Sequence, residues 1–304
     1  MTSKLKWVPI LGIVGISQKN EINYAPAEPD ALLNLPGSNT AVIKSNRWFD
    51  SGQISFKVTI QNDSVIPSKI GAQIILNHGS ARELYIGIGA GGTFGIQAFE
   101  NGKLTNLGLS GGPNLSAGTY EVMVKVIGSY IHLYINEVAV VSVIATIVKC
   151  QPAVYIRGEY PITISDIKVD SATSKAFVIM QFTEEYNELY KEVIKPTVEN
   201  YDIECIRADD IYTSGPILQD ITQSIIESAI IIADITPDNP NVFYEVGYAH
   251  AIKKPVILLS DNQRNNKLPF DVSGFRVILY ENSIGGKTKV ENRLKKHIKK
   301  VLGY

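Results

Sequence analysis

Residues 229–235 form an apolar run, broken only by Asp234, and a segment rich in Pro and Asn follows at once. A β-branched run bounded by turn residues predicts a buried strand. Asn239 suits the N-cap position of a helix and Pro240 its first turn, so a helix is expected to begin there. A strand that leads directly into a helix favours an α/β arrangement for this part of the chain.

Two acids lie in this stretch, Asp234 near the carboxyl end of the expected strand and Glu245 in the second turn of the expected helix. Ligands of open α/β sheets bind outside the carboxyl ends of the strands, so both carboxylates are candidates for one site. The alternative is structural. Asp234 then caps the turn, and Glu245 is a solvated acid near a helix start, where the helix dipole favours negative charge.

Strand and helix patterns alternate throughout residues 175–304. Strands are expected at residues 175–182, 203–207, 229–235, 255–259 and 275–280. Helices are expected at 184–201, where Pro196 disturbs the pattern, from Ser214 and Pro216 onward, from Asn239 onward, and at 289–302. Such repeats predict a parallel sheet with helices on both faces, in a flavodoxin-like strand order.

Residues 47–169 follow a different pattern, in which Gly-rich turns separate short runs of alternating or β-branched residues. Many short strands at this spacing predict a β-sandwich. Residues 7–16 are read as one early strand, since they are too few to span a bilayer. The polar junction 170–174 separates the two patterns, so we expect an α+β chain of two domains, a sandwich at 1–170 and an α/β domain at 175–304.

The formal net charge is −1, which gives no electrostatic reason to expect nucleic acid or an anionic membrane as a partner. Cys150 and Cys205 are the only cysteines and fall in different expected domains. Neither a disulfide framework nor a cysteine-rich metal site is therefore expected. A cytoplasmic location is expected, with no metal ion and no bound cofactor.

The strand pattern of residues 111–136 and 161–169 resembles the concanavalin-like or laminin-G-like jelly roll. Proteins of that group often bind glycans, and Trp7, Trp48 or Tyr130 offers a stacking face for a sugar. Burial of these aromatics in a core or an interface is the preferred alternative. The resemblance therefore implies a module for sensing, docking or oligomerisation, with a glycan or a protein as its ligand.

Residues 177–182, 206–210, 215–217, 233–236, 239–251 and 254–259 together resemble bacterial proteins of the nucleoside 2-deoxyribosyltransferase-like group, a fold relative of Toll/interleukin-receptor (TIR) domains. Glu245-Val246-Gly247-Tyr248-Ala249 matches the family segment whose glutamate attacks the anomeric carbon. The resemblance implies that Glu245 is the catalytic nucleophile. In TIR NADases a glutamate on the equivalent helix is likewise essential.

The same resemblance implies that Asp234 binds sugar hydroxyls or holds the nucleophile. The other expected substrate-binding residues are Gln181, Phe182, Asp209, Asn241 and Tyr248. Residues 180–185 depart from the small-residue loop of metabolic transferases, and no Gly-rich phosphate loop is present, so purine salvage is not expected.

These observations predict an enzyme that acts on a nucleotide N-glycosidic bond, with NAD⁺ as its substrate, in bacterial antiphage defence. The sandwich is expected to regulate it, and a homo-oligomer is expected because a neighbouring subunit often completes TIR-like sites. The alternatives are a nucleotide-binding sensor without catalysis and a carbohydrate receptor that acts through the sandwich.

Overall fold

The computed structural model describes residues 4–27, 39–61, 69–90, 92–111, 115–210, 217–262 and 274–303. The chain divides into two compact units, with the boundary between residues 172 and 173. The part before this point is called the sandwich unit and the part after it the α/β unit. Two short segments of the first part, Ile127–Tyr130 and Ile144–Ile147, group with the second unit.

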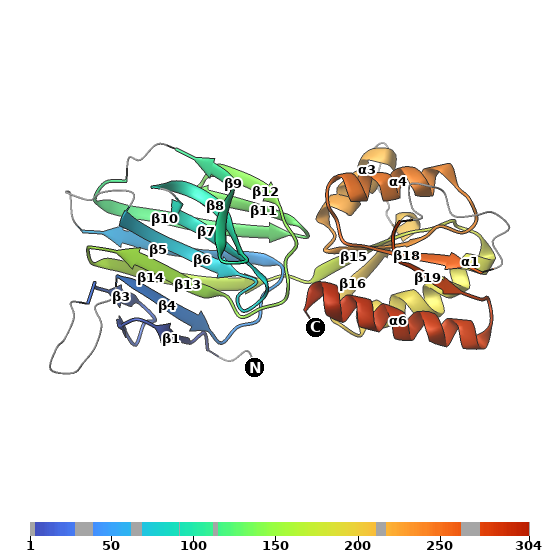
Figure 1. Cartoon of the computed structure of the whole chain (residues 1–304), viewed down its shortest axis with the longest axis horizontal. Helices are drawn as coiled ribbons and strands as arrows, with labels where there is room; N and C mark the ends of the chain where they lie inside the picture. Colours follow the sequence, from blue (N-terminus) through green and yellow to red (C-terminus); the bar gives the residue numbers. More distant parts are fainter. Residues whose placement is uncertain are drawn as a thin grey trace. The chain divides into compact units, whose positions relative to one another are not determined.

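The sandwich unit consists of two seven-stranded antiparallel sheets, which confirms the predicted β-sandwich (Figure 1). In spatial order the first sheet contains β1 (Trp7–Leu11), β4 (Thr40–Ser45), β13 (Ala153–Gly158), β6 (Ile70–Leu76), β7 (Arg82–Ala90), β8 (Thr93–Glu100) and β9 (Lys103–Ser110). The second contains β12 (Val138–Ile144), β11 (Tyr130–Ile135), β10 (Gly118–Ile127), β5 (Gly52–Ile60), β14 (Ile162–Ser171), β3 (Ile22–Tyr24) and β2 (Val14–Ile16).

Period-two alternation fixes which side of each sheet is buried. In β5, Ile54, Phe56 and Val58 are buried in the core. Ser55 and Lys57 lie between them and are only partly buried. Lys57 therefore lies on the outward face of the second sheet.

The sequence prediction is wrong for the first strand. Residues 7–16 form two strands, β1 and β2, which belong to different sheets. Gly12 separates them with φ of 73°, a conformation that L side chains rarely adopt. The sequence reading also missed β9, because this edge strand is mostly exposed and lacks an alternating apolar pattern.

The α/β unit contains a five-stranded sheet in which all neighbouring strands are parallel. Its spatial order is β16 (Ile203–Arg207), β15 (Ser174–Ile179), β17 (Ile230–Asp234), β18 (Val256–Asp261) and β19 (Val277–Tyr280). All five strands were expected, within a few residues at each end. Helices cover both faces of the sheet, which explains why the central strand β17 is an unbroken Ile-rich run.

One face of the sheet is covered by α1 (Glu184–Leu189), η2 (Tyr190–Ile194), α2 (Lys195–Glu199) and α6 (Ile284–Leu302). The other face is covered by α3 (Ile217–Glu227) and α4 (Pro240–Ala251). Figure 1 shows these two helical layers on either side of the strands. The turn after β17 thus leads directly into α4, on the second face.

Three boundaries differ from the sequence prediction. The first helix widens into the π-helical turn η2 before Pro196, whose ring and missing N–H do not fit a regular helix interior. Helix α6 begins at Ile284, earlier than expected, because the Ser283 hydroxyl accepts a hydrogen bond from the Gly286 amide at 3.1 Å. The junction 170–174 is largely strand, since β14 ends at Ser171 and β15 begins at Ser174. The helix start expected at residues 214–216 lies outside the described residues.

Candidate functional site

A cavity of about 410 Å³ lies in the α/β unit at the carboxyl end of β15. Its walls come from β15 and the residues after it, from the residue after β16, and from α3 and α4. The lining residues are Val178, Ile179, Met180, Gln181, Phe182, Ala208, Leu218, Ile221, Asn239, Asn241, Val242, Tyr244 and Glu245. Among the described residues that line this cavity, Glu245 is the only one with a charged side chain.

Helix α4 delivers Glu245 to the cavity. The side chain of Asn239 accepts a hydrogen bond from the Asn241 amide at 2.9 Å, and Pro240 is the first helical residue, so the predicted helix start is confirmed. Glu245 follows Asn241 by four residues and shares its face of the helix. Val242 and Val246 are buried against the sheet and fix the rotation of the helix.

The carboxylate of Glu245 is half-buried and has no hydrogen-bond or ion-pair partner among the residues that the structure describes. Burial raises the pKa of Glu245 to about 7, because a carboxylate loses solvation in an apolar cavity. Near neutral pH both protonation states are therefore populated. Such a group is able to attack an electrophilic carbon, to stabilise a developing cation or to transfer a proton.

Three amide side chains and two aromatic rings complete the chemically active lining. The Asn239 amide donates a hydrogen bond to Gln181 Oε1 at 3.5 Å, so the turn before α4 is connected to the end of β15. The rings of Phe182 and Tyr244 are 51% and 56% exposed, which leaves their faces available to a planar ligand. The predicted residues Gln181, Phe182, Asn241 and Glu245 are thus brought together.

Asp234 does not line the cavity. It is fully buried, and its carboxylate accepts hydrogen bonds from the Tyr280 hydroxyl at 2.5 Å and from the Thr236 amide at 3.0 Å. Burial raises its pKa to about 7, an effect that these hydrogen bonds oppose. The hydrogen bond from the Thr236 amide caps the turn, which is the structural role given above as the alternative for Asp234.

Asp209 lies outside the cavity lining as well. Its carboxylate forms a bidentate ion pair with the guanidinium of Arg207. Arg207 is only 3% exposed, and its guanidinium carbon lies 4.3 Å from the ring centre of Tyr190 and 5.1 Å from that of Phe182. Asp209 therefore holds Arg207, which in turn supports the cavity ring Phe182.

Tyr248 is partly buried and packs against the apolar core between the sheet and helices α3 and α4. Burial raises its pKa, and it does not line the cavity. The sequence reading missed Tyr244, whose position next to Glu245 and three residues after Asn241 places it beside them on the helix. It also missed Arg207, for which the adjacent pair Asp209 and Asp210 was the available signal.

Within the described ranges, no group of three or more His, Cys, Asp or Glu side chains is arranged to hold a metal ion. No helix in those ranges is long and apolar enough to cross a membrane. Cys150 and Cys205 are both buried and not joined in a disulfide, and burial raises the pKa of Cys205 to about 12.

No protein-family model matches the chain, and no curated protein matches it. Among solved structures, a carbohydrate-binding module from Bacillus subtilis has a TM-score of 0.41 at 10% identity, with 53% of this chain and 92% of that chain covered. A CMP N-glycosidase from Clostridium botulinum has a TM-score of 0.33 at 19% identity, with 41% and 99% covered. A β-glucanase from Bacillus licheniformis has a TM-score of 0.35 at 12% identity, with 54% and 90% covered. Similarities at this level say nothing of the activity of this chain.

Proposed function

We propose that the α/β unit cleaves the N-glycosidic bond of a nucleotide or nucleoside, with Glu245 as the group that attacks or stabilises the anomeric carbon. The observation that carries this proposal is the carboxylate of Glu245. It is half-buried, has no partner among the described residues and lies in a cavity at the strand ends. Ordinary structural acids are solvated or paired, so this placement favours a chemical role.

In the proposed reaction the bond between the anomeric carbon and the base nitrogen breaks, and its electron pair leaves with the base. Positive charge then develops on the sugar. The ionised carboxylate of Glu245 either forms a covalent bond to the anomeric carbon or stabilises the cation electrostatically. Water then supplies a hydroxyl to that carbon, and on the covalent route the bond to Glu245 breaks and returns its electron pair to the carboxylate. The proton of the water goes to a base that left as an anion, or to the solution when the base left as a neutral molecule, which gives the free sugar and the free base.

The strand order of the sheet supports this assignment. Numbered along the chain within the unit, the order is 2-1-3-4-5, which is the flavodoxin-like order, with its switch point between β15 and β17. Ligands of such sheets bind at the carboxyl ends of the strands beside that point. The cavity at the end of β15, closed by α4, lies there.

The composition of the cavity favours NAD⁺ among possible substrates. Glu245 is the only side chain of the described lining that titrates near neutral pH. If it is ionised and acts on the sugar, no second acid is present in that lining to protonate a departing base. Nicotinamide carries a positive charge in NAD⁺ and leaves as a neutral molecule, so its departure needs no such acid.

Under this proposal the sandwich unit senses a signal or drives assembly into a homo-oligomer that completes the site. The corresponding setting is a cytoplasmic effector of antiphage defence. The second candidate function is a sensor that binds a nucleotide without cleaving it. That candidate is favoured by the amide and aromatic groups of the cavity, which bind a planar base equally well without chemistry.

The test is mass spectrometry of products after the whole chain, dilute and concentrated, is incubated with NAD⁺ and with a panel of nucleosides and nucleotides. We expect release of nicotinamide or a free base, and a loss of at least about 10³-fold in Glu245→Gln. Glu204→Gln changes an exposed acid on β16 and serves as the matched control. Full turnover by Glu245→Gln contradicts the proposal. Thermal stabilisation by a nucleotide without any product supports the sensor.

A further inference from the structure

Arg207 is the last residue of β16, and its side chain is only 3% exposed. It does not line the cavity of the α/β unit. Its guanidinium carbon lies over the ring of Phe182 at 5.1 Å, and Phe182 does line that cavity. Any effect of Arg207 on a bound ligand is therefore transmitted through a neighbour, and Phe182 is the neighbour with an exposed face.

Hydrogen bonds occupy the edges of this guanidinium. Nε donates to Asp209 Oδ1 at 2.5 Å, and Nη2 donates to the other oxygen of the same carboxylate. Nη1 donates to Asn187 Oδ1 at 2.8 Å. A bidentate pair fixes the plane of the guanidinium as well as its place. The charge of Arg207 is thus used within the protein, and the flat faces of its guanidinium remain for aromatic rings.

Tyr190 is the second ring that contacts the guanidinium. The guanidinium carbon lies over the Tyr190 ring at 4.3 Å, and Tyr190 is 2% exposed. The Tyr190 hydroxyl donates to Asp210 Oδ2 at 2.7 Å, and the same oxygen accepts from the Arg207 amide at 3.2 Å. Tyr190 is therefore held in place, and Arg207 connects this fixed ring to the ring of Phe182.

Phe182 depends on this support more than a core residue does. It follows β15 in a segment without helix or strand, and it is 51% exposed. An aromatic side chain in such a place has more than one accessible rotamer. A cation over one ring face favours a single orientation of the ring. The other face of the Phe182 ring then stays open to the cavity.

The stability of the fold does not by itself explain this arrangement. A buried ion pair gives little net stability compared with apolar residues of similar volume. The Asp209 side chain is also 41% exposed, so water screens part of its attraction to Arg207. What the pair does provide is a fixed orientation of the guanidinium and of the rings beside it.

We propose that Arg207 is a positioning residue for substrate binding, which orients Phe182 so that the open face of its ring stacks on the base of the substrate. A ring that is already oriented loses little rotamer freedom when the ligand arrives, so binding is tighter. This inference rests on the proposed function in one respect, namely that the ligand carries a planar base. Since Phe182 contacts the base and not the reacting carbon, Arg207 should affect KM much more than kcat.

The experiment measures ligand binding in Glu245→Gln by calorimetry, so it does not depend on turnover. The probes are NAD⁺ and adenosine. We expect Arg207→Lys in this background to weaken binding about five- to tenfold, because lysine keeps the charge but lacks the planar fork that pairs with Asp209 and stacks on the rings. Lys195→Met is the matched control and should bind the probes normally. Lys195 Nζ lies over the Tyr190 ring at 5.9 Å, and Tyr190 does not line the cavity.

A double-mutant cycle distinguishes positioning from a purely structural role. Phe182→Ala alone should weaken binding about tenfold, and adding Arg207→Lys to it should cause no further loss. A structural role predicts the same loss from Arg207→Lys whether or not the ring is present. Asp209→Asn releases one anchor of the guanidinium at a partly exposed site, and it should show the same dependence on Phe182 if Arg207→Lys does not fold.

The kinetics of the chain with Glu245 intact give a second readout. Arg207→Lys should raise KM for NAD⁺ while kcat stays within about twofold of wild type. Unchanged affinity in Arg207→Lys, an equal loss with and without the Phe182 ring, or no binding of either probe overturns the proposal. Absence of turnover with binding retained contradicts the catalytic proposal alone and leaves this one unaffected.

Discussion

The two cavities of this protein present carboxylates in opposite environments. Glu245 of the α/β unit is half-buried and has no partner among the described residues, and its pKa is raised to about 7. Glu121 and Asp166 of the sandwich unit are mostly exposed and share the ammonium group of Lys57. The carboxylate of Glu245 is thus able to react, whereas the carboxylates of Glu121 and Asp166 are held as hydrogen-bond acceptors. Burial and the local charges, rather than residue type, decide the role.

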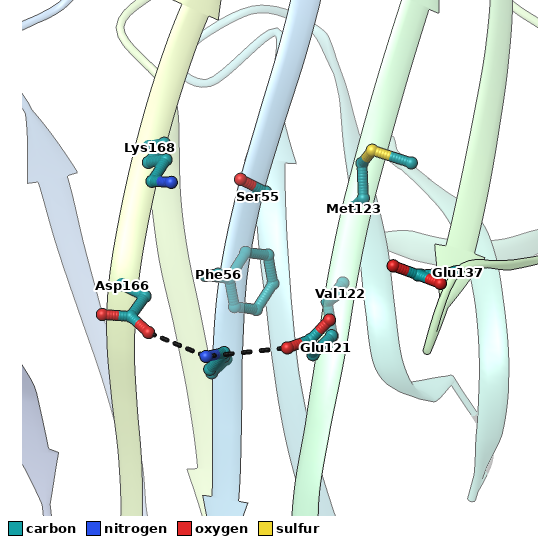
Figure 2. Close-up of a pocket in the computed structure, with 9 residues that line it drawn as sticks. Ser55, Phe56, Glu121, Val122, Met123, Glu137, Asp166 and Lys168 are labelled. Atoms are coloured by element: carbon teal, nitrogen blue, oxygen red, sulfur yellow. Dashed lines mark ion pairs between the residues drawn. The ribbon is translucent and has the colours of Figure 1, made fainter.

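The difference also follows from architecture. The α/β cavity lies at the ends of parallel strands, where a helix start delivers a side chain into an apolar crevice. The cavity of the sandwich unit, of about 490 Å³, is lined by residues of β5, β10 and β14 and lies on the solvent face of these antiparallel strands, where outward side chains remain hydrated (Figure 2). A reaction that needs a desolvated carboxylate is favoured in the first setting, and reversible recognition of a hydrated ligand in the second.

The largest expected contrast is in pH dependence. If Glu245 acts in its ionised form, its raised pKa means that kcat/KM of the proposed reaction falls about tenfold per pH unit below about 7. Initial rates measured between about pH 5.5 and 8.5 give this profile. A kcat/KM that does not change with pH over this range would contradict the proposed role of Glu245.

The second contrast concerns stability. Burial raises the pKa of Asp234 to about 7 in the folded chain, against 3.8 for a solvated aspartate, so the folded state retains a proton that the unfolded state loses. Its contribution to stability is complete below about pH 4 and is lost as pH rises to about 7, at roughly 1.4 kcal/mol per pH unit. Asp234→Asn should reduce the dependence of the free energy of unfolding of the α/β unit on pH, as measured by urea denaturation at several pH values. Glu121→Gln in the sandwich is the control. The same pH dependence in Asp234→Asn as in wild type contradicts the expectation.

A smaller effect is expected at the aromatic wall of the α/β cavity. Phe182 is backed by the guanidinium of Arg207, a contact of about 0.5–2 kcal/mol. Phe182→Ala should raise KM about tenfold with a smaller change in kcat, because it removes a stacking face rather than the reacting group. Phe182→Tyr keeps the ring and should retain KM. Equal losses in kcat for both variants would assign Phe182 a different role.

The smallest expected effect is on the stability of the sandwich unit. Lys57→Met breaks two exposed ion pairs, and such pairs contribute little in water. The midpoint temperature of its unfolding should therefore match that of wild type and that of Lys69→Met, which breaks the exposed ion pair with Glu159 at 2.8 Å. A clear fall in that temperature, absent from Lys69→Met, would show that the ion pairs of Lys57 stabilise the sheet.

Much of the fold follows from local sequence pattern. The Ile-rich run, Asn239 and Pro240 specify a buried strand and a helix start, and both are present in the structure. They also predict the helix face on which Glu245 lies, because that face depends on the number of residues between Glu245 and the helix start. The residue pattern did not predict the break at Gly12 or the π-helical turn before Pro196. Both depend on the elements that pack against these segments in the folded chain.

Periodicity and capping act over a few residues, so the residue pattern was sufficient to predict the strands of the parallel sheet and the helix face that carries Glu245. The contacts of three other groups appear only in the folded chain: Asp234 accepts a hydrogen bond from Tyr280, Asp209 pairs with Arg207, and Lys57 pairs with Glu121 and Asp166. The contact of Asp234 with Tyr280 and the contacts of Lys57 join residues from different strands, so strand order and bulge position set them, and no local pattern encodes either one. Arg207 and Asp209 are two residues apart, but their pairing beside the rings of Tyr190 and Phe182 depends on the burial of Arg207.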